Sequence, residues 1–569
     1  VSIATGLDFT FNSVVIGKGA NSVAGNTVLG ESALDASVTG GENTAIGKEA
    51  LTALTSGVKN TAVGLSAGKA LTTGDNNTFI GRNAGITTTT ADNNTGLGLN
   101  ALNTNSTGAN NVAIGMQALN SSTTASNNVA IGMQAMISNT TGTTNVAVGQ
   151  AALNANTTAS NSTAVGYQAL LLNTTGANNT AVGNQALDAN TTASNNTAVG
   201  RLALTANTTG SENIAVGANA LDANTTGSLC VALGRHALSA NTTANSNTAL
   251  GHNTLMANTT GSENVAVGTS TLIQNSTGGS NTAVGANALD ANTTASNNTA
   301  VGVNSLGANT TGTSNTACGL GALGANTTAS DNTAFGSVAL SVNTTGASNT
   351  AVGREALQQN TTASNNTAVG YQALEENTTG TRNVALGAFS LDANTTADHN
   401  IAVGAFTLSA NTTGNSCTAV GSSALEANTT ASNNTAVGRA ALLANTTGFN
   451  NLAVGVNTLD ANTTGANHIA IGNEALGANT TGSDNLAIGF STLEKNTTGI
   501  RNVGVGSNAL EDNVTNNYNV AIGYDVLREA TANNNTGVGY AALKENTTGG
   551  GNVAVGANAL DANTTGNNS

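Results

Sequence analysis

The chain has 569 residues, of which 8% are charged, 2% are aromatic and 39% are hydrophobic, with 69 Gly and no Pro or Trp. These values exclude an ordinary globular core, which needs large aromatic side chains, and a disordered chain, which is poor in apolar residues. The formal net charge is −15 without a basic cluster, which argues against nucleic acid or membrane partners. No apolar run reaches the roughly 18 residues of a membrane helix.

The first 25 residues do not follow the pattern of the rest. Residues 1–11 are irregular and contain Phe9 and Phe11, two of only eight Phe. A solenoid exposes an open strand edge at each end. We therefore expect residues 1–25 to form a capping segment with a first strand, and residues 26–569 to form one continuous repeat array. No signal-peptide pattern precedes the array, so we expect a processed chain or a segment of a longer one.

One period organises the array. From Gly30 to Gly523 a glycine recurs every 17 residues without a miss, and the register resumes at Gly539 and Gly556 after a deletion of one residue. The resulting 32 units share an apolar residue before the glycine. The fourth residue after the glycine is Leu in 29 of 32 units, and the fourth before it is Asn in 28 of 32.

The composition of a single unit predicts extended structure. In residues 196–200, Asn-Thr-Ala-Val-Gly, side chains alternate with the period of a strand. The Ala-Leu pair at 203–204 predicts a second extended piece, and Asn-Thr-Thr-Gly at 207–210 predicts a turn. Seventeen residues are too few for the paired helices of helical repeats. The sequence thus predicts an all-β parallel β-solenoid of about 32 coils, each rising about 4.8 Å, or a rod of roughly 150 Å.

Equivalent residues of successive units are the candidate structural ladder. We expect the Asn amides to stack in the interior, and the Val and Leu to fill the core. The glycine is expected to need a positive φ or a close backbone contact, whereas the turn glycine, for example Gly312, alternates with Ala and is expected to tolerate it. In two adjacent units the ladder residues are Asn196, Val199, Gly200, Leu204, Asn213, Val216, Gly217 and Leu221.

Most units also carry Asn-x-Ser/Thr in the turn, for example at Asn207, Asn224, Asn292 and Asn309. One interpretation makes these asparagines glycan acceptors on an exported rod. The stronger interpretation is that Asn and Thr satisfy backbone groups of the stacked coils.

Short strand motifs resemble a known family. Residues 12–17 (NSVVIG), 110–115 and 127–132 (both NNVAIG) resemble the NSVAIG repeat of YadA-like trimeric autotransporter adhesin heads. The longer unit, as in residues 179–192, is similar to repeats of phage tail-fibre proteins. The resemblance covers residues 12–566. It implies a left-handed parallel β-roll that forms a homotrimer along the fibre axis and attaches to surfaces.

The sequence shows no cluster of catalytic or metal-binding residues. The four His occupy different positions of the repeat, and no metal-ligand motif occurs. Acidic residues that follow the Leu, at Asp188, Asp222, Asp290 and Asp392, are expected to face solvent in an interrupted stripe. We therefore predict no enzymatic activity, no cofactor and no metal.

The three Cys lie in distant units. Cys230 and Cys417 replace the ladder Asn, and Cys318 replaces the apolar residue before the glycine, which we expect in the core. Their separations are too large for an intrachain disulfide. On a trimer axis, however, copies of one Cys would meet.

These observations favour a structural and adhesive extracellular fibre of a cell-surface appendage, a filament or a phage tail fibre. The expected partners are other copies of the chain, as a homotrimer or a head-to-tail filament, and a surface receptor for which carbohydrate is one candidate. Trimer formation has a physical motive, because a thin roll has one apolar face of Leu and another of Val, Thr and Ala. The alternatives are an ice-binding solenoid that uses Thr ladders such as Thr208–Thr209, and a polysaccharide-cleaving solenoid without a visible catalytic cluster.

Overall fold

The computed structural model describes residues 8–569, so the part of the expected cap in residues 1–7 lies outside the described residues. The chain divides into two compact units, Val1–Asn281 and Thr282–Ser569. Each unit is a parallel β-solenoid with one short strand in every coil. The described residues contain no α-helix, and only a 3₁₀ turn at Ala20–Ser22 (η1).

The strands contain three or four residues each. Those of the first unit are β1 (Phe9–Phe11), β2 (Val14–Gly17), β3 (Thr27–Gly30), β4 (Thr44–Ile46), β5 (Thr61–Val63), β6 (Thr78–Ile80), β7 (Thr95–Leu97), β8 (Val112–Ile114), β9 (Val129–Ile131), β10 (Val146–Val148), β11 (Thr163–Val165), β12 (Thr180–Val182), β13 (Thr197–Val199), β14 (Ile214–Val216), β15 (Val231–Leu233), β16 (Thr248–Leu250) and β17 (Val265–Val267). Those of the second unit are β18 (Thr282–Val284), β19 (Thr299–Val301), β20 (Thr316–Cys318), β21 (Thr333–Phe335), β22 (Thr350–Val352), β23 (Thr367–Val369), β24 (Val384–Leu386), β25 (Ile401–Val403), β26 (Thr418–Val420), β27 (Thr435–Val437), β28 (Leu452–Val454), β29 (Ile469–Ile471), β30 (Leu486–Ile488), β31 (Val503–Val505), β32 (Val520–Ile522), β33 (Thr536–Val538) and β34 (Val553–Val555).

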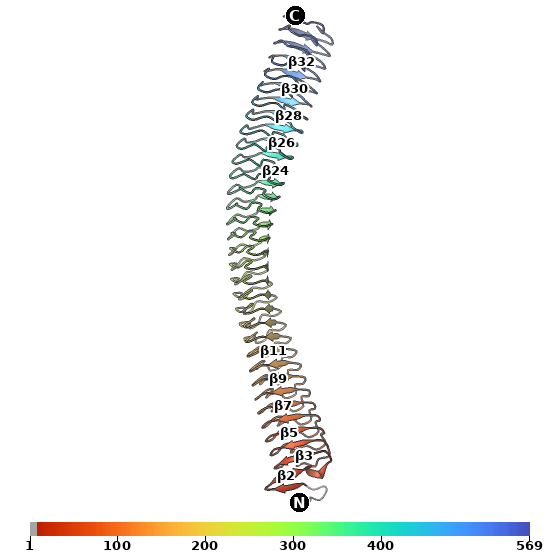
Figure 1. Cartoon of the computed structure of the whole chain (residues 1–569), viewed down its shortest axis with the longest axis vertical. Helices are drawn as coiled ribbons and strands as arrows, with labels where there is room; N and C mark the ends of the chain where they lie inside the picture. Colours follow the sequence, from red (N-terminus) through yellow and green to blue (C-terminus); the bar gives the residue numbers. More distant parts are fainter. Residues whose placement is uncertain (1–7) are drawn as a thin grey trace. The chain divides into compact units, whose positions relative to one another are not determined.

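Within each unit, successive strands pair in parallel and in sequence order (Figure 1). Between β13 and β14, for example, Thr197 lies opposite Ile214 and Val199 opposite Val216. The offset is one 17-residue period, so equivalent residues of neighbouring coils lie side by side and form rows. We name each row after its residue in coil 196–212.

The first unit begins differently. Strands β1 and β2 form an antiparallel pair, and β2 is antiparallel to β3, so the parallel array starts between β3 and β4. The Asp8 carboxylate accepts hydrogen bonds from the backbone N–H groups of Lys18 and Gly19, at 2.5 and 2.7 Å. Phe11 is 63% exposed. The hairpin therefore lies against β3 through its backbone.

The interior of a coil is narrow and consists mainly of small and polar residues. Asn196, Ala198, Ala203, Leu204 and Asn207 are fully buried in the reference coil. These five rows supply most of the core in both units. Since the interior holds only one large side chain per coil, the strand can contribute no more than Ala to it.

The outward side of the strand carries Thr197 and Val199. The alternation predicted from the sequence is confirmed, but the expectation that Val199 and Val216 fill the core is wrong. Val199 is partly exposed and Val216 is 37% exposed. The reason is steric, because the inward direction has room for Ala198 and is closed by Leu204.

The segment after the strand is a tight turn, so the expected second extended piece is also absent. Leu202 and Leu204 have φ values of 58° and 53°, in the left-handed region that L residues rarely adopt. The N–H of Leu204 donates to the carbonyl of Ala220 in the next coil at 3.0 Å. Hydrogen bonds between coils thus stabilise a conformation that costs energy locally.

The strand glycines are required by the backbone. Gly200 and Gly217 have φ values of 137° and 135°. A Cβ added to Gly200 would lie 2.5 Å from the carbonyl oxygen of Gly217. Conformation and contact together explain why this position holds glycine in every unit.

Candidate interaction surface

The strand asparagines form a buried row in which every coil binds its neighbours. The backbone N–H of Asn213 donates to Oδ1 of Asn196 at 2.9 Å, and Nδ2 of Asn196 donates to the carbonyl of Gly210 at 3.0 Å. Both asparagines are fully buried. The link from coil to coil is thus mainly a backbone N–H to a side-chain oxygen, in place of the expected amide stack.

The turn asparagines form a second buried row. Nδ2 of Asn207 donates to Oδ1 of Asn190 at 3.0 Å and to the carbonyl of Gly210 at 2.9 Å. Asn224 and Asn309 make the equivalent bonds to the preceding coil, to Oδ1 of Asn207 at 2.9 Å and of Asn292 at 3.1 Å. The row is continuous from Asn139 to Asn275 in the first unit and from Asn292 to Asn513 in the second.

This burial bears on the glycan acceptors suggested by the sequence. Asn207, Asn224, Asn292 and Asn309 are all fully buried. A glycan is attached through Nδ2, the atom that makes these internal hydrogen bonds, so it would remove them and force the side chain out of the core. The structure fits the other interpretation, in which the turn satisfies backbone groups. Thr208 belongs to it, since its hydroxyl donates to the carbonyl of Thr225 at 3.0 Å.

Two cysteines replace asparagine in the first row. Cys230 and Cys417 are buried, and burial raises the pKa of both thiols, that of Cys417 to about 11. Cys230 still receives the previous coil through its N–H, which donates to Oδ1 of Asn213 at 3.0 Å. Cys318 lies instead on the outward side of β20 and is partly exposed, so its expected place in the core is wrong.

The acidic residues after the Leu lie beside the turn and are partly buried. Asp188 accepts a hydrogen bond from the Thr205 hydroxyl at 2.7 Å, and Asp222 accepts one from Asn219 at 3.1 Å. Burial raises the pKa of Asp290, and that of Asp392 to about 6. No group of three or more His, Cys, Asp or Glu in residues 8–569 is placed to hold a metal ion.

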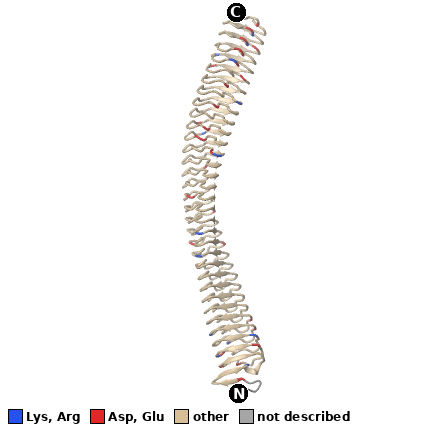
Figure 2. Ribbon diagram, viewed as in Figure 1, with Lys and Arg blue, Asp and Glu red and all other residues tan. Residues whose placement is uncertain are grey.

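The outward side of the strands is the most uniform surface of both units. It consists of the Thr197 row and the Val199 row, which we call the outer face. Across the 32 coils from β3 to β34, the Val199 row contains only Val, Ile, Leu, Phe and Cys, and neither row contains a charged residue. Figure 2 shows how few charged residues the coils carry.

The outer face is accessible to solvent in the single chain. Val182, Ile214 and Leu250 are 37%, 41% and 46% exposed. Monomeric soluble proteins rarely expose a contiguous apolar patch larger than a few hundred Å². A charge-free apolar face that recurs in every coil is therefore the feature of this chain that points to a partner.

No protein-family model matches the chain, and the search of curated proteins found no match. In the described part of the chain, no helix has the length and apolar character needed to span a bilayer. The argument for function consequently depends on the outer face and on the repeat itself.

Proposed function

We propose that this chain is a structural fibre protein whose copies associate along the outer face as a homotrimer, in an extracellular appendage, a filament or a phage tail fibre that mediates attachment. The observation that carries the proposal is the Val199 row, which is apolar in every coil although it faces solvent. The hydrogen-bonded coils of each unit suit a stiff spacer, since every coil is tied to the next by its backbone and by two rows of asparagine.

Folding of one chain does not explain the apolar character of this row. The interior is filled by the Ala198 and Leu204 rows, so Val199 contributes little to the core. A solvated strand position is equally well served by Thr, which has high β-propensity. Thr occupies 18 of 32 positions in the neighbouring Thr197 row and none in the Val199 row. Exclusion of Thr from an exposed strand row indicates contact with another apolar surface.

The ice-binding alternative receives less support. It places flat Thr ladders at Thr208–Thr209, but these residues lie in a bend. The Thr208 hydroxyl is already engaged with the next coil.

Molecular mass in solution tests the proposal. We expect three chains per particle in sedimentation equilibrium. Substitution of Val352 and Val369, adjacent on the outer face, by Lys should shift the mass to one chain, because charges would be buried in the contact. The matched control places Lys at Thr362 and Thr379, in the exposed turns of the next two coils. A single-chain mass for the unmodified protein, or an unchanged mass for the Val352→Lys/Val369→Lys variant with a native circular dichroism spectrum, would contradict the proposal.

Cys318 gives a second readout. Its thiol lies on the outer face, whereas Cys230 and Cys417 are buried and act as internal controls. Mild oxidation should cross-link chains through Cys318, and Cys318→Ser should abolish the cross-link. Absence of cross-linking in particles that contain three chains would place the contact elsewhere.

A further inference from the structure

Aromatic side chains of the second unit gather at one corner of the coil. This corner is formed by the two residues after the strand glycine, equivalent to Arg201 and Leu202. It holds six of the nine Phe and Tyr of residues 282–569, on two of seventeen positions: Tyr371, Phe389, Phe406, Phe490, Tyr524 and Tyr540. Such enrichment at a surface corner is typical of a contact region.

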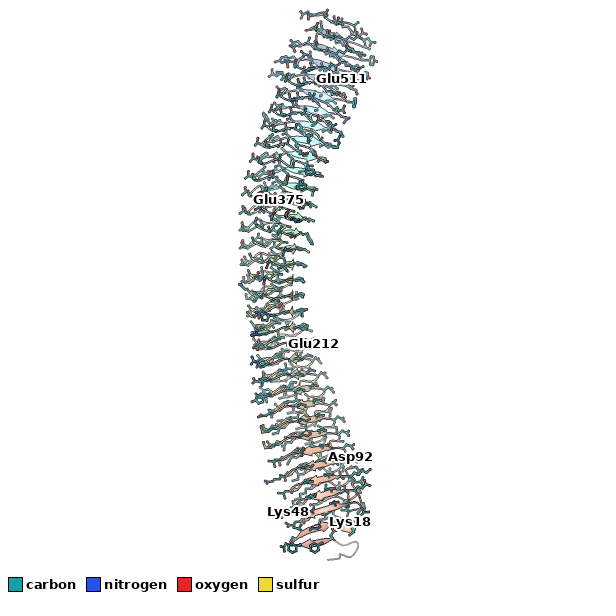
Figure 3. The ribbon with its side chains drawn as sticks, in the orientation of Figure 1. Lys18, Lys48, Asp92, Glu212, Glu375 and Glu511 are labelled. Carbon is teal, nitrogen blue, oxygen red and sulfur yellow. The ribbon has the colours of Figure 1, made fainter. Side chains whose placement is uncertain are left out.

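Three of these rings form a continuous stack over successive coils. The centroids of Tyr371 and Phe389 are 5.2 Å apart with the rings edge to face, and those of Phe389 and Phe406 are 5.2 Å apart with an interplanar angle of 8°. The coil that carries Tyr371 also carries Glu375, which is labelled in Figure 3. The stack is thus a defined ridge within the second unit.

One end of the ridge is closed by a cation from the chain itself. The guanidinium carbon of Arg354 lies 5.8 Å from the centroid of Tyr371. Nε and Nη2 of Arg354 donate to one oxygen of Glu355, at 2.9 and 2.6 Å. The ring, the guanidinium and the carboxylate therefore make a cation–π contact and an ion pair at the same place.

The other end of the ridge is open. Phe406 stacks on Phe389 with one face, and its second face is turned toward the next coil. That coil offers only Ser422 and Ser423 at this corner, and Phe406 remains 46% exposed. An aromatic face is thus left for an external group.

A carboxylate lies beside this open face. Glu426 follows Ser423 by three residues, a spacing at which Asn219 and Asp222 form a hydrogen bond in the first unit, at 3.1 Å. Within residues 8–569, the Glu426 carboxylate has neither a hydrogen-bond donor nor a cationic partner. At the closed end, by contrast, Glu355 is paired with Arg354.

We propose that the open end of the ridge binds an arginine side chain of a protein partner, with the guanidinium stacked on Phe406 and paired with Glu426. A guanidinium is planar and fits both a ring face and a carboxylate, which an ammonium group matches less well. The net charge of −15 attracts basic segments over distance. The outer face takes no part, so this proposal does not rest on trimer formation.

The test is the binding of a fluorescent peptide of nine arginines to the full chain, followed by fluorescence anisotropy at physiological ionic strength. Phe406→Ala and Glu426→Gln should each raise Kd about three- to fivefold, the range of one exposed cation–π contact. The matched controls are Phe449→Ala, an exposed ring outside the ridge, and Glu376→Gln, an exposed carboxylate of the Tyr371 coil. Both should leave Kd unchanged.

Two outcomes would overturn the proposal. The first is an equal Kd for the Phe406 and Phe449 variants, which would mean that the peptide follows only the net charge. The second is binding of a neutral oligosaccharide, maltoheptaose, that depends on Phe406 when arginine binding does not. The Glu426→Gln variant keeps the test decisive if Phe406→Ala fails to fold.

Discussion

The backbone N–H of Asn485 donates a hydrogen bond to Nδ1 of His468 at 3.3 Å, in the place where other coils use an Asn side-chain oxygen. Nε2 of the same ring lies 2.6 Å from the carbonyl of Gly482, which is the partner of an Asn Nδ2 elsewhere. The ring therefore accepts at Nδ1 and donates at Nε2, as an asparagine amide does. This match requires a neutral imidazole, and burial lowers the pKa of His468 to about 4.

Acid should weaken the coils around His468. The pKa is about 6.5 in the unfolded chain and about 4 in the folded one, so the unfolded chain binds the proton more tightly. Stability is complete above pH 6.5 and falls as the pH drops toward 4, by at most about 3 kcal/mol. Amide hydrogen exchange at Asn485, corrected for intrinsic rates, should show this loss between pH 7 and pH 5.

His468→Asn restores the common residue and should remove that pH dependence. A comparison is needed because Asp392 titrates in the opposite sense. Its pKa is raised to about 6, so its contribution is greatest at low pH and is lost as the pH rises through 6. An unchanged pH profile at Asn485 in His468→Asn would show that the ring does not act as inferred.

The strand glycines should tolerate no side chain. Ala at Gly285 and Gly302 would adopt φ values of 134° and 136°, with Cβ atoms 2.5 and 2.4 Å from the carbonyl oxygen of the next coil. We expect each substitution to cost more than about 2 kcal/mol, seen as a lower melting temperature. Gly307→Ala is the matched control, since its Cβ would meet nothing closer than 3.4 Å. Equal melting temperatures for the two kinds of variant would reject this explanation.

The turn glycine Gly312 no longer serves as a neutral control. A Cβ there would lie 2.1 Å from the carbonyl oxygen of Ala329. Ala occurs at this turn position in many units but never in two consecutive ones. The geometry accounts for that spacing, and Gly312→Ala would place three Ala in succession.

Phe79 occupies space that Leu fills elsewhere. It is fully buried on β6, and a Cβ on Gly85 would lie 2.4 Å from its ring, while one on Gly68 would lie 3.1 Å from it. Phe79→Ala should cost about 3–5 kcal/mol in urea unfolding. Adding Gly68→Leu and Gly85→Leu to Phe79→Ala should recover much of it, because those positions already have the φ of the usual Leu. Failure of the triple variant to exceed Phe79→Ala in stability would show that the residues are not coupled.

The sequence predicts the period, the strand and the buried Leu, because these follow from spacing and alternation alone. It does not predict which side of the strand faces inward. Thr197 and Val199 are more apolar in bulk than Asn196 and Ala198, yet the latter pair is buried, since only small side chains and a hydrogen-bonded amide fit opposite Leu204. The left-handed backbone of Leu204 is likewise invisible in the sequence, because it depends on closing the coil.

The aromatic ridge is visible in the sequence only once the rows are known. Tyr371 and Phe389 are 18 residues apart and Phe406 follows 17 later, which has no meaning without the coil register. The register places the rings together, and their contact distances follow from it.

The hydrogen bonds between coils join residues 14 to 20 positions apart, as in Asn196 to Gly210 and Lys69 to Glu49. A typical separation of 17 in a chain of 569 corresponds to a relative contact order of about 0.03, below that of helical bundles. Parallel β-structure is usually slow to form, since distant segments must first meet. Here each new coil needs only the coil before it as a template, so the array can fold progressively from one end while the chain is still being synthesised.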